Sequence, residues 1–283
     1  MKPGLPYQII DAHHHFWHYD PTRDSWITNE MQVLQKDFLP QDLKTVFQQH
    51  QISGSIVVQQ DQSEAENRYL LDLAEKNSFV RGVVGWVDLQ SDNLEESLSF
   101  YKSFPRLKGF RHVLQGEKQR DRMLYPAFQK GIGLLNSFDY SYDILIYPDQ
   151  LDFTEKLVAN FPDQRFVIDH LAKPAVKTGK IHDWIQAIRR FSKYPHVFCK
   201  ISGMVTEADW INWKTDQFRP CMDAVLETFG TKRIMFGSDW PVCLLAGTYE
   251  EVLEITKEYF SSFSLTEQAD FFSGNANRFY HLI

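Results

Sequence analysis

Short hydrophobic runs rich in Val, Ile and Phe recur along the chain, and each run is followed by polar turn residues and then by an amphipathic stretch. The eight runs begin at Ile9, Ser55, Gly82, Lys108, Tyr142, Arg165, His196 and Arg233. Their mean spacing of roughly 32 residues is the length of one strand with its crossover helix. The pattern therefore predicts an α/β fold, a (β/α)8 TIM barrel.

The amphipathic segments between these runs predict the outer helices. We expect helices over residues 41–50, 63–76, 93–104, 125–135, 150–160, 181–193, 218–229 and 249–260, and a last helix over 266–279. Residues 16–40 lack clear periodicity, and we expect them to form a loop over the exit of the first strand. Because no linker composition interrupts the series, residues 1–283 are interpreted as a single domain.

Composition and charge narrow the class of protein. The 283 residues are 43% hydrophobic and 24% charged, as in an ordinary globular protein, and the formal net charge of -7 comes without a Lys/Arg-rich stripe. Nucleic acids and anionic membranes are therefore not expected partners. The sequence has no secretion signal, no apolar run of about 18 residues and no CxxC pair among its three cysteines. We expect free thiols and a cytoplasmic protein, and the oligomeric state stays open, a homo-oligomer included.

Candidate chemistry concentrates where the predicted strands end, which is where the reacting groups of such barrels lie. The first strand ends in Asp11-Ala12-His13-His14-His15, so regular alternation puts Asp11, His13 and His15 on one face. Two imidazoles on one face are spaced to bind one divalent ion or to polarise a substrate, and Asp11 is placed to orient a ring. A surface cluster of histidines is the alternative, but it does not explain the position after a buried-type strand.

Two further strand ends carry candidate catalytic groups. The sixth strand places Phe166, Ile168 and His170 on one face, with the imidazole at the rim. The eighth strand ends in Gly237-Ser238-Asp239, where the small residues allow close approach and Asp239 is placed to act as a general base on water. A hydrogen-bonded structural histidine and a helix-capping aspartate are the alternative interpretations.

Positively charged side chains also converge on the strand ends, and they are Lys108, Arg111, His112, Lys173 and Lys200. A lysine in a buried strand requires a carboxylate, an anionic ligand or a developing oxyanion, so a structural ion pair and a catalytic role for Lys200 are equally open. Arg111 and His112 are adjacent, so only one of them faces inward in a regular strand.

The remaining candidates suit a polyhydroxylated ligand. Gln59 closes the second strand, and Glu66 follows in the next helix, where a capping box with Ser63 is the stronger explanation. Trp17 and Trp240 are candidates for stacking on a sugar ring, although loop tryptophans commonly only pack. The substrate-binding candidates are therefore Trp17, Gln59, Glu66, Arg111, His112, Lys200 and Trp240.

The motifs DAHHHFW, KGFRH, IDHLAKP, CKISG and FGSDWP, in this order and at barrel spacing, resemble the amidohydrolase superfamily, in particular its amidohydrolase-2 branch of sugar-lactone and other lactone hydrolases. The resemblance covers essentially the whole chain. It implies metal-ligand positions at His13, His15, His170 and Asp239, and catalytic positions at His170 and Asp239. It also implies hydrolysis by a water molecule that the aspartate deprotonates.

The chain departs from the binuclear members of that superfamily, which supply a bridging carboxylated Lys or Glu from strand 4 and histidines from strands 5 and 6. Here strand 5 ends Leu145-Ile146-Tyr147-Pro148 without a histidine. A full binuclear cage is therefore not expected. The remaining four groups suit one Zn²⁺ with an open position for water, or catalysis without metal.

The resemblance implies a hydrolase that opens an aldonolactone, such as L-fucono- or L-rhamnonolactone, to the sugar acid in carbohydrate catabolism. The expected partner is thus a small-molecule lactone. Two alternatives stay open at this point. One is a metal-dependent decarboxylase of the same branch, and the other is a barrel that binds sugar acids without turnover.

Overall fold

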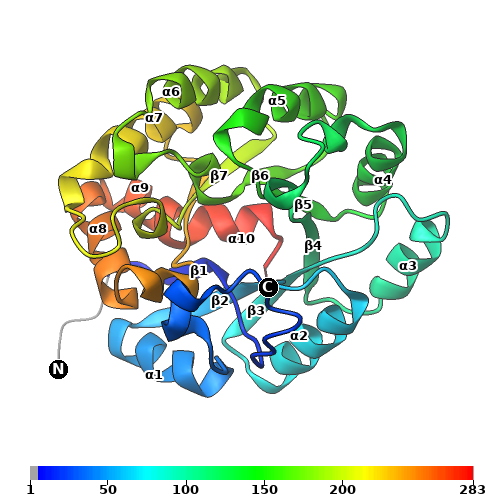
Figure 1. Cartoon of the computed structure of the whole chain (residues 1–283), viewed down its shortest axis with the longest axis horizontal. Helices are drawn as coiled ribbons and strands as arrows, with labels where there is room; N and C mark the ends of the chain where they lie inside the picture. The colour runs from blue at the N-terminus through cyan, green and yellow to red at the C-terminus, as the bar shows by residue number, and fades with distance from the viewer. Residues whose placement is uncertain (1–5, 283) are drawn as a thin grey trace.

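A computed structural model describes residues 6–282, which form a barrel of eight parallel strands in sequence order (Figure 1). The strands are β1 (Ile9–His14), β2 (Ile52–Val58), β3 (Val80–Gly85), β4 (Leu107–His112), β5 (Ser141–Ile144), β6 (Phe166–Ile168), β7 (Val197–Ile201) and β8 (Ile234–Phe236). All eight predicted strands are present. The predicted (β/α)8 barrel is therefore confirmed.

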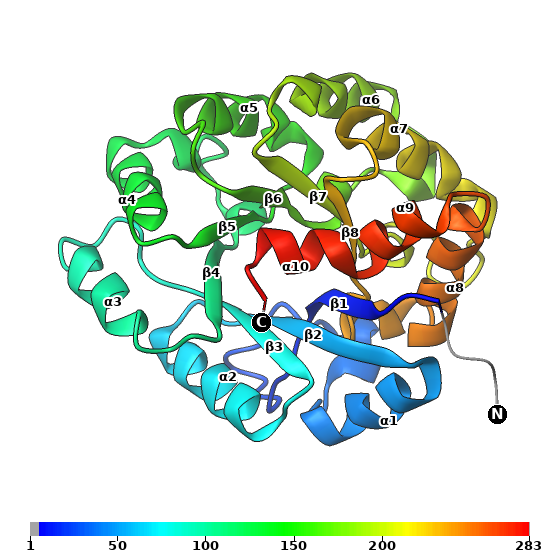
Figure 2. The same cartoon turned by 180° about the vertical axis from the view of Figure 1, so that it is seen from behind.

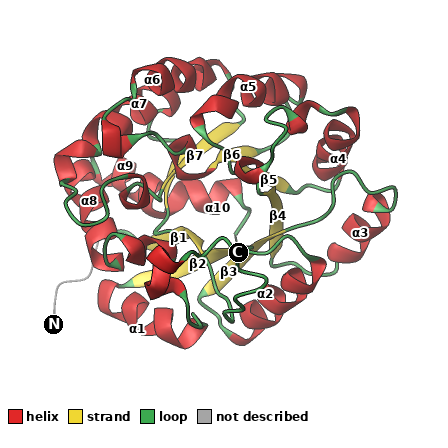
Figure 3. Cartoon of the chain, viewed as in Figure 1, coloured by secondary structure: helices red, strands yellow, loops and turns green. Residues whose placement is uncertain are grey.

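Within residues 6–282, ten α-helices accompany the strands, and the first eight form a ring outside them (Figure 3). They are α1 (Pro40–His50), α2 (Glu64–Lys76), α3 (Leu94–Tyr101), α4 (Pro126–Ser137), α5 (Leu151–Asn160), α6 (His182–Arg189), α7 (Arg219–Phe229), α8 (Tyr249–Phe260), α9 (Leu265–Ala269) and α10 (Asn275–Phe279). The predicted last helix is interrupted between α9 and α10 by a π-helical turn over Asp270–Gly274. No helix within residues 6–282 combines the length and apolarity needed to span a bilayer.

Two hydrophobic cores hold these layers together. The larger core lies between strands and helices, as in the contact of Phe47 on α1 with Phe79. The smaller core fills the barrel interior with residues of β1, β2, β3, β6 and β8 and with Phe279 and Tyr280 at the end of the chain. Seen from behind, α10 crosses the barrel opening (Figure 2). This end is thus largely filled by apolar side chains, and the candidate histidines and Asp239 lie toward the opposite end.

Backbone contacts between β1 and the segment after β8 close the barrel. His14 pairs with Trp240 in a parallel bridge, Asp239 N donates to His13 O at 2.8 Å, and His15 N donates to Trp240 O at 2.7 Å. Gly237 permits this approach, because a Cβ there would lie 2.7 Å from the Cβ of His13. The seam therefore joins the strand ends that carry the candidate histidines and aspartate.

Candidate active site

A bulge at the end of β1 directs the candidate histidines inward. The pairing of β1 with β2 shifts register between Asp11 and His14, and the Asp11 carboxylate accepts hydrogen bonds from His13 N at 3.1 Å and Ser238 N at 2.9 Å. The ring of His14 packs outward against Phe47 of α1. The prediction that Asp11 shares a face with His13 and orients a ring is therefore wrong, because the bulge breaks the alternation and Asp11 binds backbone N–H groups and the Ser238 hydroxyl instead.

A left-handed turn after β6 directs His170 into the same end of the barrel. The four residues His170 to Lys173 have φ values of 51°, 54°, 57° and 52°. Phe166 and Ile168 pack in the outer core and Val167 faces the interior, so the prediction that Phe166, Ile168 and His170 share a face is wrong. The strand ends at Ile168, and the turn rather than alternation orients the ring.

The His170 ring is held by the two residues that follow β7. Its Nδ1 lies 2.9 Å from Ser202 Oγ. Gly203, at φ +60°, passes so close that a Cβ there would lie 2.7 Å from Nδ1. Glycine is therefore required on both conformational and steric grounds. This contact leaves Nε2 as the nitrogen that faces Asp239.

Three imidazoles converge on one carboxylate oxygen. Oδ1 of Asp239 lies 3.5 Å from Nε2 of His15, 3.8 Å from Nε2 of His170 and 3.9 Å from Nε2 of His13. Burial raises the pKa of Asp239, but His170 and His15 lower it more, so the pKa lies below its usual value. Asp239 is thus an almost fully buried side chain that is a carboxylate at neutral pH.

These groups suit one divalent ion. Tetrahedral Zn²⁺ with bonds of about 2.0–2.1 Å holds its ligand atoms about 3.3 Å apart. The Nε2 atoms of His13 and His15 are 3.2 Å apart, and ligand atoms of His13, His170 and Asp239 all lie within 4.8 Å of one another. Burial lowers the pKa of His13, His15 and His170, which keeps the rings neutral with lone pairs to donate. Nη1 of Arg111 lies 3.3 Å from Nε2 of His13 and competes for one of them.

A buried ionic network supports the His13 ring from below. Lys200 Nζ lies 2.5 Å from Asp143 Oδ2, 3.0 Å from Asp169 Oδ1 and 3.1 Å from Nδ1 of His13. Nη1 of Arg111 lies 3.2 Å from the other Asp169 oxygen. The two cations balance the two carboxylates. Carboxylate contact with the second ring nitrogen is the usual way in which a ligating histidine is oriented.

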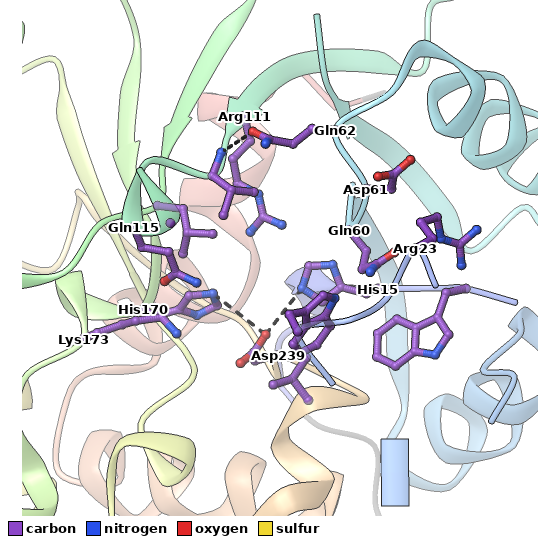
Figure 4. A pocket seen from close by; sticks show the side chains of 16 residues that line it. His15, Arg23, Gln60, Asp61, Gln62, Arg111, Gln115, His170, Lys173 and Asp239 are labelled. Atoms are coloured by element: carbon purple, nitrogen blue, oxygen red, sulfur yellow. Dashed lines mark hydrogen bonds and ion pairs between the residues drawn. The ribbon is translucent and has the colours of Figure 1, made fainter. Parts of the chain in front are cut away.

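A pocket of about 370 Å³ opens above these groups (Figure 4). Asp239, His15 and His170 lie at its floor, and the 16–40 segment contributes Trp17, Arg23 and Trp26 to its wall. The other lining residues are Gln60, Asp61, Gln62, Arg111, Val113, Gln115, Gly116, Leu145, Lys173 and Val242. Polar and aromatic groups surround a space of small-molecule size.

Of the seven predicted substrate-binding residues, Trp17 and Arg111 line this pocket and the others lie elsewhere. Lys200 is fully buried in the ionic network. His112 points away from the pocket to Glu117, at 2.7 Å, so Arg111 is the inward-facing member of the pair. Gln59 Nε2 donates to Arg111 O at 3.1 Å and supports that strand from behind.

Two further predictions on substrate contact do not match the pocket. Trp240 packs against Phe16 and Phe38. Glu66 accepts hydrogen bonds from the backbone N–H groups of Gln60 and Asp61, both at 2.6 Å, while Ser63 caps the helix. Burial raises the pKa of Glu66 to about 7, and those two N–H groups oppose the shift. Glu66 therefore holds the loop that lines the pocket rather than the pocket itself.

Sequence reasoning missed polar residues that lie two to four positions beyond the strand ends. The run Gln60-Asp61-Gln62 directly after Gln59 was a visible signal for a pocket-lining loop. Asp143 also had a signal, because a carboxylate inside a predicted buried strand needs a cationic partner. Trp26 had none, since it lies in the aperiodic 16–40 segment.

Comparison with known proteins extends the resemblance. The family model described as amidohydrolase matches residues 10–282. The chain is 38% identical over 284 residues to L-fucono-1,5-lactonase of Burkholderia multivorans, covering 96% of each chain. It is 34% identical over 279 residues to L-fucono-1,5-lactonase of Burkholderia ambifaria, covering 96% of this chain and 95% of that relative.

A solved structure agrees with these matches. An amidohydrolase from Burkholderia multivorans, crystallised with bound Zn, superposes with a TM-score of 0.93 at 37% identity and covers 98% of this chain and 100% of that chain. The fold, the motif order and the sequence similarity all lead to one assignment. The chain belongs to the amidohydrolase family.

Proposed function

We propose that this protein hydrolyses a sugar lactone to the corresponding sugar acid. The observation that carries the proposal is the convergence of three neutral imidazoles on the Asp239 carboxylate at the floor of a pocket of about 370 Å³. The names of the two Burkholderia relatives support an L-fucono-1,5-lactone or a similar aldonolactone as substrate. A lactone is an activated ester, and it suits a site with one general base and few metal ligands.

Asp239 is the general base in this proposal. It takes a proton from water as the oxygen attacks the lactone carbonyl carbon, and it then delivers that proton to the ring oxygen as the C–O bond breaks. The low pKa of Asp239 keeps it deprotonated before each turnover, since the electrostatic interaction with the neighbouring His170 and the hydrogen bond from His15 offset the effect of burial. The product at this point is a carboxylic acid, which releases the second proton of the water to solvent and becomes the carboxylate.

The proposed metal ligands are His13, His15, His170 and Asp239, and a bound divalent ion there polarises the carbonyl and acidifies water. The chain's own groups orient both partners in either case. Asp169 and Lys200 fix the His13 ring from its Nδ1 side, and Ser202 fixes His170. We propose that the oxyanion faces these imidazoles.

The pocket wall supplies the partners for hydroxyl groups. Gln60, Asp61, Gln62 and Gln115 offer both donors and acceptors to a polyhydroxylated ring. Trp17 and Trp26 line the same pocket with aromatic surface, and their two ring centroids are 6.2 Å apart. This combination of amide, carboxylate and indole groups favours a sugar-derived lactone over an aromatic acid.

A pH-stat titration with a panel of aldonolactones, simple amides and phosphate esters tests the proposal. We expect acid release from aldonolactones, with L-fucono-1,5-lactone among the best substrates. Activity confined to amides or phosphate esters would refute it.

The three buried free thiols are consistent with a reducing compartment, and we propose that the reaction takes place in the cytoplasm.

A further inference from the structure

The left-handed turn after β6 brings a charged side chain, that of Lys173, to the pocket beside His170. Lys173 N donates to His170 O at 2.7 Å, so the turn is closed by a bond between residues i and i+3. Side chains three positions apart eclipse in a turn of this bonding pattern. His170 and Lys173 accordingly line the same cavity, together with Asp239 (Figure 4).

The chain holds this turn in an unfavourable conformation. All four residues from His170 to Lys173 have positive φ although none is glycine, and Cβ groups disfavour that region. Leu171 and Ala172 are fully buried between the two polar residues, and Nε1 of Trp184 on α6 donates to Leu171 O at 2.8 Å. Strain that the surrounding structure maintains at a pocket points to a functional requirement. Here the turn positions two side chains, whereas the candidate base and ligands account for His170 alone.

Among the described residues, Lys173 has fewer polar partners than Arg111 and Arg23, the other cations that line the pocket. Arg111 is paired with Asp169 at 3.2 Å and bonded to Gln59. Arg23 makes hydrogen bonds of 2.7 and 2.8 Å to Asp24. Lys173 Nζ lies 3.3 Å from one carboxylate oxygen of Glu207, and within residues 6–282 this is its one ion pair. An ammonium group has three donors, so Lys173 retains capacity for an anionic ligand.

Lactone hydrolysis changes the charge in the pocket. A neutral ring is converted to a carboxylate, which forms at the carbonyl carbon beside the already negative Asp239. Two carboxylates at close range repel each other unless a cation stands between them. Lys173 lines the same pocket. Burial raises the pKa of Asp239, and His170 and His15 lower it more strongly. The positive charge of Lys173 lowers it further.

We propose that Lys173 binds the carboxylate that hydrolysis creates, so that its ammonium group donates to an oxygen of the sugar-acid product. This inference rests on the proposed function. Before turnover the ammonium is held near the pocket by Glu207. When the product forms, the carboxylate competes with Glu207 for it. Lys173 is thereby a residue that recognises the anionic aldonate and stabilises the negative charge developing on the acyl group.

The experiment compares binding of an aldonate with binding of the matching alditol, which has the same hydroxyl groups and no carboxylate. Isothermal titration calorimetry on wild type and Lys173→Met measures both. A hydrogen bond to a charged group is worth roughly a 10- to 100-fold change in affinity. We expect Lys173→Met to weaken aldonate binding by that factor and to leave alditol binding unchanged.

Three further variants control the result. Lys173→Arg keeps the charge and should retain aldonate binding within about 5-fold, which covers the case in which Lys173→Met does not fold. Glu207→Gln removes the competing carboxylate and should tighten aldonate binding up to about 5-fold. Lys177→Met removes an exposed lysine that does not line the pocket, and it should change neither affinity.

The outcomes separate this inference from the proposed function. Equal losses of affinity for aldonate and alditol in Lys173→Met would show that Lys173 only shapes the pocket. Unchanged aldonate affinity would show that Lys173 does not bind the carboxylate. Each result overturns the inference. Either result in a protein that still hydrolyses aldonolactones leaves the proposed function intact. A wild type that releases no acid from any aldonolactone would refute the proposed function itself.

Discussion

Replacing Lys200 by methionine distinguishes a structural cation from one that acts on substrate. Lys200 is fully buried, and its Nζ lies 2.5 Å from Asp143 and 3.0 Å from Asp169. Methionine fills a similar volume but leaves two carboxylates facing the single guanidinium of Arg111. Removing one partner of a buried ion pair costs about 3–5 kcal/mol. For a chain of this size we expect the melting temperature to fall by roughly 6–15 °C.

The loss of stability should depend on pH, because Asp143 can take up a proton in place of its lost cation. Burial raises the pKa of Asp143 from 3.8 to about 6, and Lys200 opposes this rise. Without Lys200 the folded-state pKa rises further. A carboxyl group with a raised folded-state pKa contributes stability below its unfolded pKa, and that contribution is lost as pH rises through the folded-state value. Lys200→Met should therefore be closest to wild type near pH 5 and most destabilised near pH 8.

Urea denaturation of wild type, Lys200→Met, Asp143→Asn and the double variant at both pH values measures these effects. The double variant removes one negative charge with the positive one, so it should be more stable at pH 8 than the sum of the single changes predicts. If Lys200→Met stays within about 1 kcal/mol of wild type at both pH values and yet loses turnover, the reasoning is wrong. Lys200 would then act on the substrate.

Three other changes test the site. Asp239→Asn keeps the size of the side chain but removes the base, so kcat in the pH-stat assay should fall by roughly 10²–10⁴, and near-normal turnover by a folded variant would assign the proton transfer to a histidine. Metal analysis of the purified wild type should find at most one divalent ion per chain, and His13→Asn should lose it; two bridged ions in an anomalous-scattering map would contradict this ligand set. The pKa of Glu66, raised to about 7 by burial, implies stability that is lost as pH rises from 4.5 through 7. The melting temperature of Glu66→Gln, followed by circular dichroism, should consequently fall less between pH 5 and pH 8 than that of wild type, and parallel curves would argue against a protonated Glu66.

The sequence predicted the barrel and its reactive end because both depend on local periodicity. Strand period, helix period and the strand-end position of His13, His15 and Asp239 are all visible within a few residues. The direction of each side chain was less accessible. The bulge after Asp11 and the left-handed turn at His170 replace regular alternation. Neither place has a residue type that predicts the change.

Contacts between distant parts of the chain account for the remaining differences. The hydroxyl of Tyr280 donates to Asp143 Oδ2 at 2.7 Å across 137 positions of sequence. Such a pair follows from the closed barrel and its last helix rather than from a local pattern. The same reason explains why Trp26, and not Trp240, reaches the pocket. The fold of the 16–40 segment is set by tertiary contacts such as the pairing of Trp17 with Phe38.

The seam between β1 and β8 has a consequence for engineering. The backbone atoms that close the barrel belong to His13, His15, Asp239 and Trp240. The hydrogen bonds that close the barrel therefore also set the distances between the candidate reactive groups. Libraries of variants in the loops after β2 and β4 would alter the pocket wall and leave the seam between β1 and the segment after β8 intact. A side chain larger than hydrogen at Gly237 would instead push β1 away from the segment after β8 and so separate the proposed base from two of its imidazoles. Variants with new substrate ranges are thus best obtained by changing residues of the pocket wall, without changing residues of the seam.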